Sequence, residues 1–265
     1  MLAFDTSTEV MAIAAAGPRG VVVRELPGGA AASAQLLPQI QAVLAEAGLA
    51  YADLAAIAFG CGPGAFTGLR TSCAVAQGLG FGLARPLLPL DSLLIVAEGC
   101  LAAAPAGSPA SGAWVAVAMD ARMEEIYGAL YERKASGWHT VQAPALYTLA
   151  AWNAVLEENS ARVQCLAGSA LNAFGARLHR PPAARELPTE VHRAGALMRL
   201  AQQAHAMGAA VDAAAALPLY LRDKVALTTA ERSQAKTGAS AGASAGARAE
   251  PQAESPSGAG VGAAP

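Results

Sequence analysis

Residues 60–70 form a glycine-rich turn of the kind that binds phosphate in many proteins. The stretch reads Gly-Cys-Gly-Pro-Gly-Ala-Phe-Thr-Gly-Leu-Arg and leads from an apolar segment into a predicted helix. Such a turn directs the unpaired N–H groups of a helix N-terminus at an anion. Its spacing matches neither the P-loop, because Leu69 and Arg70 follow Gly68, nor the dinucleotide pattern G-x-G-x-x-G. We interpret it either as a weak anion site, with Thr67 as N-cap, or as a turn that only lets strand and helix pack closely.

A second polar turn, Asp5-Thr6-Ser7-Thr8, connects two short predicted strands and offers one carboxylate and three hydroxyl groups. Asp5 has two interpretations. It is either a carboxylate of a nucleotide cleft or a turn residue whose side chain accepts hydrogen bonds from the amides of Ser7 and Thr8.

Residues that bind transition metals are scattered along the chain. The histidines, at 139, 179, 192 and 205, include no H-x-x-x-H pair, and the four cysteines lack C-x-x-C spacing. We therefore predict no metal site and no disulfide framework, and we interpret the cysteines as reduced thiols of a cytosolic protein. The motifs H-E-x-x-H and G-x-S-x-G are absent too, which argues against a peptidase. A triad assembled from distant parts of the chain is not excluded.

Composition further narrows the class of protein to which the chain can belong. The 265-residue chain has a net charge of −2 and contains 54% hydrophobic residues, many of them alanine. Without a basic excess, strong independent binding to nucleic acid is not expected. The N-terminal segment has no basic stretch before an apolar core, and the longest uncharged runs contain proline and serine. We expect a soluble, cytoplasmic protein without a signal peptide or a membrane-spanning helix.

The first half alternates strands and helices. Period-two and period-3.6 apolar patterns, with glycine and polar residues at the breaks, define the elements. They predict an antiparallel meander of strands at 2–4, 10–16 and 20–26, followed by a helix at 35–47, a strand at 54–59, a helix at 67–84, a strand at 87–90 and a helix at 92–104.

The second half repeats this layout around another Asp-led turn, where we expect Arg122 to pair with Glu124 or Glu125. The predicted elements are strands at 114–119 and 126–132, a helix at 149–158, a strand at 162–166, a second glycine turn at 168–170, helices at 171–178 and 191–207, and an extended segment at 217–226. The repetition predicts a duplicated α/β domain.

Domain boundaries follow from this repetition and from composition. We expect a first subdomain at 1–104, a linker at 105–112, a second subdomain at 113–190, a C-terminal helix and closing segment at 191–231 that pack back across the subdomains, and a disordered Ala/Gly/Ser-rich tail at 232–265.

Two Asp-turn hairpins that head two α/β halves resemble the actin, sugar kinase and Hsp70 superfold. Within it, several stretches together are similar to the TsaB family, also called YeaZ: Asp5-Thr6-Ser7-Thr8, Leu36-Leu37-Pro38, residues 59–70, residues 119–127 and Pro218-Leu219-Tyr220-Leu221-Arg222. The blocks G-P-G-x-F-T-G-L-R and D-A-R-M are specific to this family and its relatives. The resemblance implies two duplicated actin-like (ribonuclease H-like) subdomains, each a mixed five-stranded-type sheet with flanking helices.

The resemblance also implies a function. Members of the family are subunits of the bacterial machinery that makes N6-threonylcarbamoyladenosine on tRNA, at the adenosine 3′ of the anticodon. The paralogue TsaD transfers the threonylcarbamoyl group, and the ATPase TsaE docks on the pair. This chain is then a non-catalytic scaffold that reaches tRNA only through the complex and forms a homodimer when TsaD is absent. Two alternatives stay open: a stand-alone ATP-binding or hydrolytic, glycoprotease-like enzyme that uses the interdomain cleft, and direct contact with tRNA.

The expected site residues fall into two groups. Residues on helices 35–47 and 67–84, most of them small or apolar, are predicted to contact TsaD: Leu36, Leu37, Arg70, Ala74, Gly78 and Gly82. A weak, remnant nucleotide cleft is predicted at Asp5, Thr6, Ser7, Gly62, Gly64 and Thr67. The G-x-x-x-G spacing of Gly78 and Gly82 fits either close packing inside the domain or a tight interface between subunits. We expect no catalytic residue, no metal ligand and no tightly bound cofactor, with ATP or ADP only in the complex.

Overall fold

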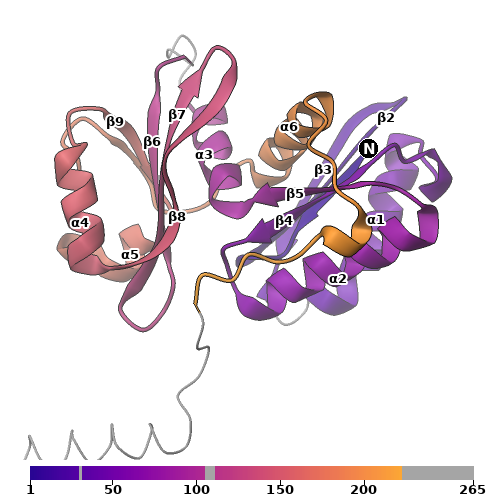
Figure 1. The fold of residues 1–265 in the computed structure, drawn as a ribbon, viewed down its shortest axis with the longest axis horizontal. Coiled ribbons are helices and arrows are strands. Elements are labelled where there is room, and N and C mark those ends of the chain that lie inside the picture. The colour runs from indigo at the N-terminus through magenta and orange to yellow at the C-terminus, as the bar shows by residue number, and fades with distance from the viewer. Residues whose placement is uncertain (30–31, 105–110, 223–265) are drawn as a thin grey trace, which may run out of the picture. The chain divides into compact units, whose positions relative to one another are not determined.

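The computed structural model describes residues 1–29, 32–104 and 111–222. Residues 1–221 form one compact unit that contains two five-stranded sheets (Figure 1). No helix among the described residues is long and apolar enough to cross a membrane.

The first sheet has the strand order β3-β2-β1-β4-β5. Its strands are β1 (Leu2–Asp5), β2 (Val10–Gly17), β3 (Gly20–Pro27), β4 (Ile57–Gly62) and β5 (Leu87–Asp91). β1, β2 and β3 form the predicted antiparallel meander, whereas β4 pairs parallel with β1 and β5 pairs parallel with β4. β4 begins three residues later than predicted, because Tyr51–Asp53 forms a short 3₁₀ turn ahead of it.

Helices cover both faces of this sheet (Figure 1). α1 (Ala32–Ala47) and α2 (Phe66–Leu83) pack on one face, where Leu2 and Phe4 of β1 are buried. α6 (Arg193–Ala206) packs on the other face, which is lined by small side chains such as Ala3, Ala12 and Ala14. Side chains alternate between the two faces of a strand, so the pattern Leu-Ala-Phe in β1 places bulk under α1 and α2 and leaves room for α6.

The second sheet has the order β10-β9-β6-β7-β8, which read from its other edge is the arrangement of the first sheet. Its strands are β6 (Trp114–Asp120), β7 (Glu125–Lys134), β8 (Gly137–Thr148), β9 (Val163–Ala167) and β10 (Arg185–Leu187). β6, β7 and β8 are antiparallel neighbours, and β9 runs parallel to β6. The predicted duplicated α/β fold is confirmed.

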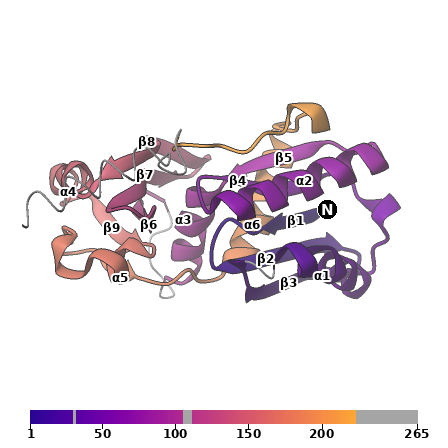
Figure 2. The ribbon, with the colours of Figure 1, turned by 90° about the horizontal axis from the view of Figure 1, so that it is seen from below.

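The second sheet is also covered on both faces. α4 (Leu149–Glu158) and α5 (Ala170–Phe174) pack on one face, and α3 (Ser92–Ala102) packs on the other (Figure 2). Gly128 of β7 lies directly under Trp152 of α4, and a Cβ atom there would come within 2.5 Å of the indole ring. Position 128 therefore requires glycine.

Several predicted elements differ from the observed ones. β8 and β10 were not expected. α5 ends at Phe174 and continues as a 3₁₀ turn at Gly175–Arg177, and α6 is shorter than the predicted 191–207. Residues 223–226 of the closing segment, most of the linker at 105–112 and the whole tail at 232–265 lie outside the described residues.

The cysteine prediction was wrong for one pair. Cys100 of α3 and Cys165 of β9 form a disulfide, whereas Cys61 and Cys73 are free. The two partners are 65 residues apart in the sequence and meet only because α3 packs on the second sheet. No local spacing could have indicated them.

Candidate functional site

The glycine turn packs against the Asp5 turn through its backbone. A Cβ atom on Gly60 would lie 2.1 Å from Asp5 Oδ2, and one on Gly68 would lie 1.9 Å from the carbonyl oxygen of Thr6. The amide of Ala65 donates a hydrogen bond of 2.7 Å to the carbonyl of Ser7. The glycines thus allow β4 and α2 to approach the first turn closely, as the packing interpretation expected.

Hydroxyl groups join the two turns further. The Thr6 amide donates to Ser72 Oγ of α2 at 2.9 Å, and the Thr6 hydroxyl donates to the carbonyl of Gly68 at 2.7 Å. The Gly62 amide donates to Ser92 Oγ at 3.1 Å. Backbone donors that an anion would need at Thr6, Gly62 and Ala65 are therefore already bonded within the chain.

Asp5 lies in a buried ion pair. Its Oδ1 accepts a hydrogen bond from the Ser7 amide at 2.6 Å, as the turn interpretation expected, and its Oδ2 accepts one from Ser92 Oγ at 3.1 Å. Arg193 Nη2 of α6 lies 2.6 Å from the same Oδ2. The Asp5 side chain is 0% exposed and the Arg193 side chain is 1% exposed. A carboxylate buried this deeply requires such compensation.

Glu190 completes the cluster from the segment before α6. Its carboxylate forms an ion pair with Arg193 Nη1, and Arg193 Nη2 also donates to Ser7 Oγ at 3.1 Å. Burial raises the pKa of Glu190, a rise that Arg193 and the Thr8 hydroxyl partly oppose. Burial by itself lowers the pKa of Arg193, but Glu190 and Asp5 outweigh it, and the pKa lies above its usual value. The guanidinium therefore stays charged.

The predicted cleft residues are only partly brought together. Asp5, Thr6, Ser7, Gly62 and Gly64 meet at the two turns, where Gly64 approaches the Ser7 carbonyl as closely as glycine permits. Thr67 is exposed and lies inside the first turn of α2. The N-cap is Ala65, which has no capping side chain, so the predicted Thr67 cap was wrong.

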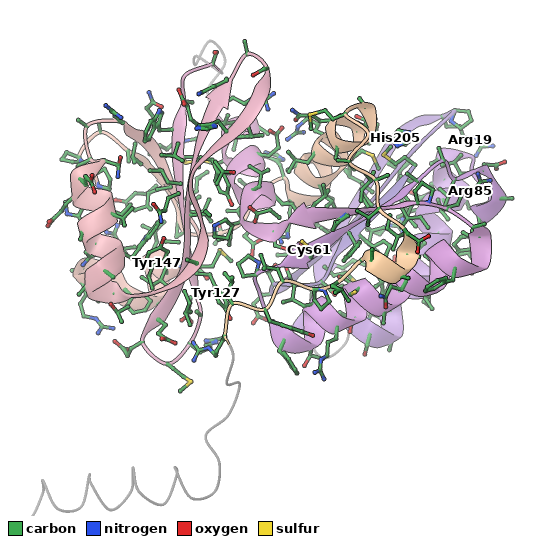
Figure 3. All side chains as sticks on the ribbon, in the orientation of Figure 1. Arg19, Cys61, Arg85, Tyr127, Tyr147 and His205 are labelled. Carbon is green, nitrogen blue, oxygen red and sulfur yellow. A yellow bond between two sulfur atoms is a disulfide. The ribbon has the colours of Figure 1, made fainter. Side chains whose placement is uncertain are left out.

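Cys61 lies between the glycines of this turn, at the end of β4 (Figure 3). Burial, with a smaller contribution from the nearby carboxylates of Asp91 and Asp5, raises the pKa of its thiol to about 12. A thiol with such a pKa is protonated at neutral pH and is a poor nucleophile.

The exposed face of α2 carries small residues that have no packing role within the described chain. Ala74 and Gly78 are exposed, and a Cβ atom on Gly78 or Gly82 would meet no atom within 4 Å. The interpretation that these two glycines serve close packing inside the domain is therefore wrong. Phe81, on the same helix, is 62% exposed.

On α1, only one of the two predicted contact residues reaches the surface. Leu37 is 48% exposed, whereas Leu36 is fully buried in the core between α1 and the first sheet. Adjacent residues of a helix point about 100° apart around its axis, so Leu36 faces the core while Leu37 faces outward. Leu36 therefore does not belong to the predicted contact surface.

Arg70 lies near the start of α2 and contacts two aromatic side chains. Its guanidinium stacks on Phe66 at 3.8 Å from the ring centre, and its Nε donates to the Tyr220 hydroxyl at 3.2 Å. The amide of Leu219 donates to the Cys61 carbonyl at 2.7 Å, which fixes the closing segment beside the glycine turn. In the part of the chain that the structure describes, Arg70 forms no salt bridge.

The second Asp-led turn is built differently from the first. Asp120 is half-buried and accepts a hydrogen bond from the Arg122 amide at 2.8 Å. Arg122 pairs with Asp120 at 3.2 Å, whereas Glu124 pairs with Arg177 at 2.6 Å. The predicted pairing of Arg122 with Glu124 or Glu125 stays a prediction. Within residues 1–29, 32–104 and 111–222, no three His, Cys, Asp or Glu side chains are placed to hold a metal ion.

Arg193, Glu190, Ser72 and Ser92 were missed by sequence reasoning. Asp5 and Arg193 are 188 positions apart, and Arg193 opens a helix whose apolar pattern gave no sign of a buried charge. A lone arginine at a helix start usually lies in solvent, so the pairing could be found only from the fold.

Two mixed sheets with the same strand order, each covered by helices on both faces, define a duplicated actin-like α/β protein. The model of the family described as TsaD, tRNA N6-adenosine threonylcarbamoyltransferase, matches residues 22–261. The solved structure of YeaZ from Pseudomonas aeruginosa is 32% identical, with a TM-score of 0.72 over 83% of this chain and 99% of that one.

Curated relatives point to the same family. The TsaB protein of Escherichia coli K12 is 33% identical over 147 residues, which are 55% of this chain and 61% of that protein. The TsaB protein of Haemophilus influenzae is 38% identical over 129 residues, which are 48% and 51% of the two chains. The matches thus span little more than half the length of these relatives. With the full-length structural match, they show that the chain belongs to the TsaB/YeaZ family.

Proposed function

We propose that this chain is a non-catalytic subunit in the formation of N6-threonylcarbamoyladenosine on tRNA, at the adenosine 3′ of the anticodon. Its partner is a TsaD-type transferase, which it contacts through the exposed faces of α1 and α2, and the ATPase TsaE joins the pair. Family membership supports the pathway, because the curated relatives are named for threonylcarbamoyladenosine biosynthesis.

The exposed small-residue face of α2 is the observation that carries the proposal. Ala74, Gly78 and Gly82 leave the helix backbone accessible, Phe81 adds an exposed apolar side chain on the same helix, and Leu37 adds one on α1. Glycine inside a helix destabilises it by about 1 kcal/mol relative to alanine. Two such glycines without internal contacts are best explained by another helix that packs closely against α2. A second copy of this chain would use the same face when the transferase is absent.

The Asp5 turn supports the non-catalytic part of the proposal. Asp5 is held in an ion pair with Arg193, and neighbouring backbone amides donate within the chain. Cys61, whose pKa is raised to about 12, is not poised as a nucleophile. ATP or ADP is therefore expected at most in the assembled complex.

Co-purification tests the contact surface. We expect Gly78→Leu to fold, because its side chain enters open space, and to lose binding to TsaD by at least about tenfold through steric obstruction of the helix contact. Ala154→Leu, which places the same side chain at an exposed position of α4, is the matched control and should bind normally. Normal pairing by a folded Gly78→Leu protein would remove α2 from the interface.

The alternative is a stand-alone ATP-dependent or hydrolytic enzyme. Calorimetry of the isolated chain with ATP and Mg²⁺, combined with turnover assays, separates the two functions. We expect neither binding nor hydrolysis. Tight binding with turnover that Asp5→Ala abolishes would overturn the non-catalytic proposal.

A further inference from the structure

The disulfide between Cys100 and Cys165 lies where the two halves of the fold meet. Cys100 is in the last turn of α3, and Cys165 is in the middle of β9 of the second sheet. α3 also contacts the helix on the first sheet, because Glu98 accepts a hydrogen bond of 2.5 Å from Arg199 Nε of α6 and one of 2.8 Å from Trp138 Nε1 of β8. The disulfide therefore attaches the second sheet to the helix that also contacts α6.

A guanidinium lies against one of the two sulfur atoms. Arg185 of β10 is paired in register with Cys165, and its Nη2 lies 3.6 Å from Cys100 Sγ. The same side chain donates to the carbonyl oxygens of Cys100 and Ala103 at the end of α3, so it is held beside the sulfur by further contacts. A positive charge next to a cysteine sulfur stabilises the thiolate. Arg185 therefore favours the reduced form and makes Cys100 the better leaving group when the disulfide opens.

Both cysteines are buried, so a reductant reaches them only through local opening. Cys100 is 1% exposed and Cys165 is 3% exposed. The elements around them are, however, of the kind that opens readily. β10 has three residues, Arg185–Leu187, and forms the edge of its sheet, and Cys100 lies close to the end of its helix. Short edge strands and helix ends open at a lower free-energy cost than the core of a sheet.

We propose that Cys100 and Cys165 are a reversible thiol–disulfide switch, which Arg185 biases towards reduction and which a small thiol such as glutathione opens and closes. In opening, the thiolate of one glutathione attacks Cys165 Sγ, the S–S bond breaks and Cys100 leaves as a thiolate beside Arg185. A second glutathione thiolate attacks the glutathione sulfur of the mixed disulfide and releases Cys165. The cysteine pair gains two electrons, the two glutathione molecules lose two and join as a disulfide, and their thiol protons pass to the cysteine sulfurs or to solvent. Closing is the reverse reaction.

The switch changes how firmly α3 is held on the second sheet. In the oxidised protein the bond is covalent and closes a loop between positions 65 residues apart, which restricts the unfolded chain. In the reduced protein only apolar contacts hold the helix there, among them those of Leu93 and Val96. The inference concerns this chain alone and does not depend on the proposed function in tRNA modification.

The test equilibrates the full-length chain in buffers with different ratios of reduced to oxidised glutathione. Free thiols are alkylated, and mass spectrometry of the peptides that contain Cys100 and Cys165 gives the fraction that is linked. Both cysteines should convert together, and full reduction should lower the melting temperature by roughly 5–15 °C. The double variant Cys100→Ala/Cys165→Ala should melt at the same temperature in all buffers. A pair that stays linked in excess reduced glutathione, a pair that stays free in excess oxidised glutathione, or a melting temperature of the wild type that ignores the ratio would each overturn the proposal.

Variants of Arg185 test the bias towards reduction. Arg185→Met should need an about tenfold higher ratio of squared reduced to oxidised glutathione for half reduction, because the Cys100 thiolate loses its cation. Arg185→Lys should stay close to the wild type. Arg180→Met, which removes a nearby arginine that pairs with Glu186, is the matched control and should not shift the ratio. A loss of general stability alone would move the melting temperature and leave this ratio unchanged, and an unchanged ratio in Arg185→Met would contradict the bias assigned to Arg185.

Discussion

Asp5 and Arg193 illustrate how one buried pair determines what a turn can do. A carboxylate at the end of a strand, next to a glycine turn, has the composition of a nucleotide site, but its second oxygen is already bonded to Arg193 and Ser92. The same atoms that a ligand would use hold α6 to the first sheet. Their main effect is therefore on the stability of the fold.

Replacing Asp5 by asparagine should destabilise the protein strongly. Asparagine removes one of the two carboxylates that compensate the buried Arg193 guanidinium, together with the charged acceptor of the Ser92 hydrogen bond, and loss of a partner from a buried ion pair lowers the free energy of unfolding by roughly 3–5 kcal/mol. Urea unfolding followed by circular dichroism measures the change. Glu46→Gln, which breaks an exposed pair with Arg24, should lower it by less than about 1 kcal/mol. Equal effects of the two variants would contradict the account of the Asp5 cluster.

Cys61 should make stability depend on alkaline pH. Its pKa is raised from 9.0 to about 12 in the folded protein, so the unfolded chain loses this proton first. The contribution of the protonated thiol to the free energy of unfolding is complete below about pH 9. It falls by up to ~1.4 kcal/mol per pH unit between about pH 9 and 12. Between about pH 8 and 10, the free energy of unfolding, measured with urea, should therefore fall by about 1 kcal/mol less in Cys61→Ala than in the wild type. Identical pH profiles would contradict the burial of this thiol.

The two ends of helix α2 carry glycines with different surroundings. Gly68 meets the Thr6 carbonyl at the start of the helix, whereas Gly82 faces open space near its end. The first glycine joins the helix to the sheet, and the second is available to another molecule.

Alanine substitutions should separate these two roles. Gly68→Ala would force its Cβ to within 1.9 Å of the Thr6 oxygen and should abolish folding or lower the melting temperature by at least about 10 °C. Gly82→Ala should stabilise the protein by about 0.5–1 kcal/mol, because it only removes the conformational entropy of glycine. Thermal unfolding of both variants checks this, and a large loss in Gly82→Ala would mean that its surroundings are filled.

Sequence patterns predicted the elements that have strong local signals. The first meander, the helix after the glycine turn and the helix at Leu149–Glu158 follow from apolar periodicity and turn residues. β8 was missed because it contains Pro144 and is largely exposed, features that favour an edge strand or a loop, and it is indeed at the sheet edge. β10 has only three residues, too few for any periodicity.

At the scale of the whole molecule, the duplication places two Asp-led turns in equivalent positions with different surroundings. Asp5 is fully buried against Arg193, whereas Asp120 is half-buried beside exposed Arg122. The sequence predicted the duplication, because both halves show the same order of strand, turn and strand. It could not predict the difference between the turns, because that difference depends on α6, a helix that returns from the far end of the chain to the first sheet.

The most direct test of the proposed function is the threonylcarbamoyladenosine content of total tRNA in the host, measured by mass spectrometry after depletion of this protein. We expect the modified nucleoside to fall severalfold, and to be restored by wild type and by Ala154→Leu but not by Gly78→Leu. Unchanged modification after complete depletion would contradict the assignment to this pathway. Full rescue by Gly78→Leu would contradict α2 as the contact surface.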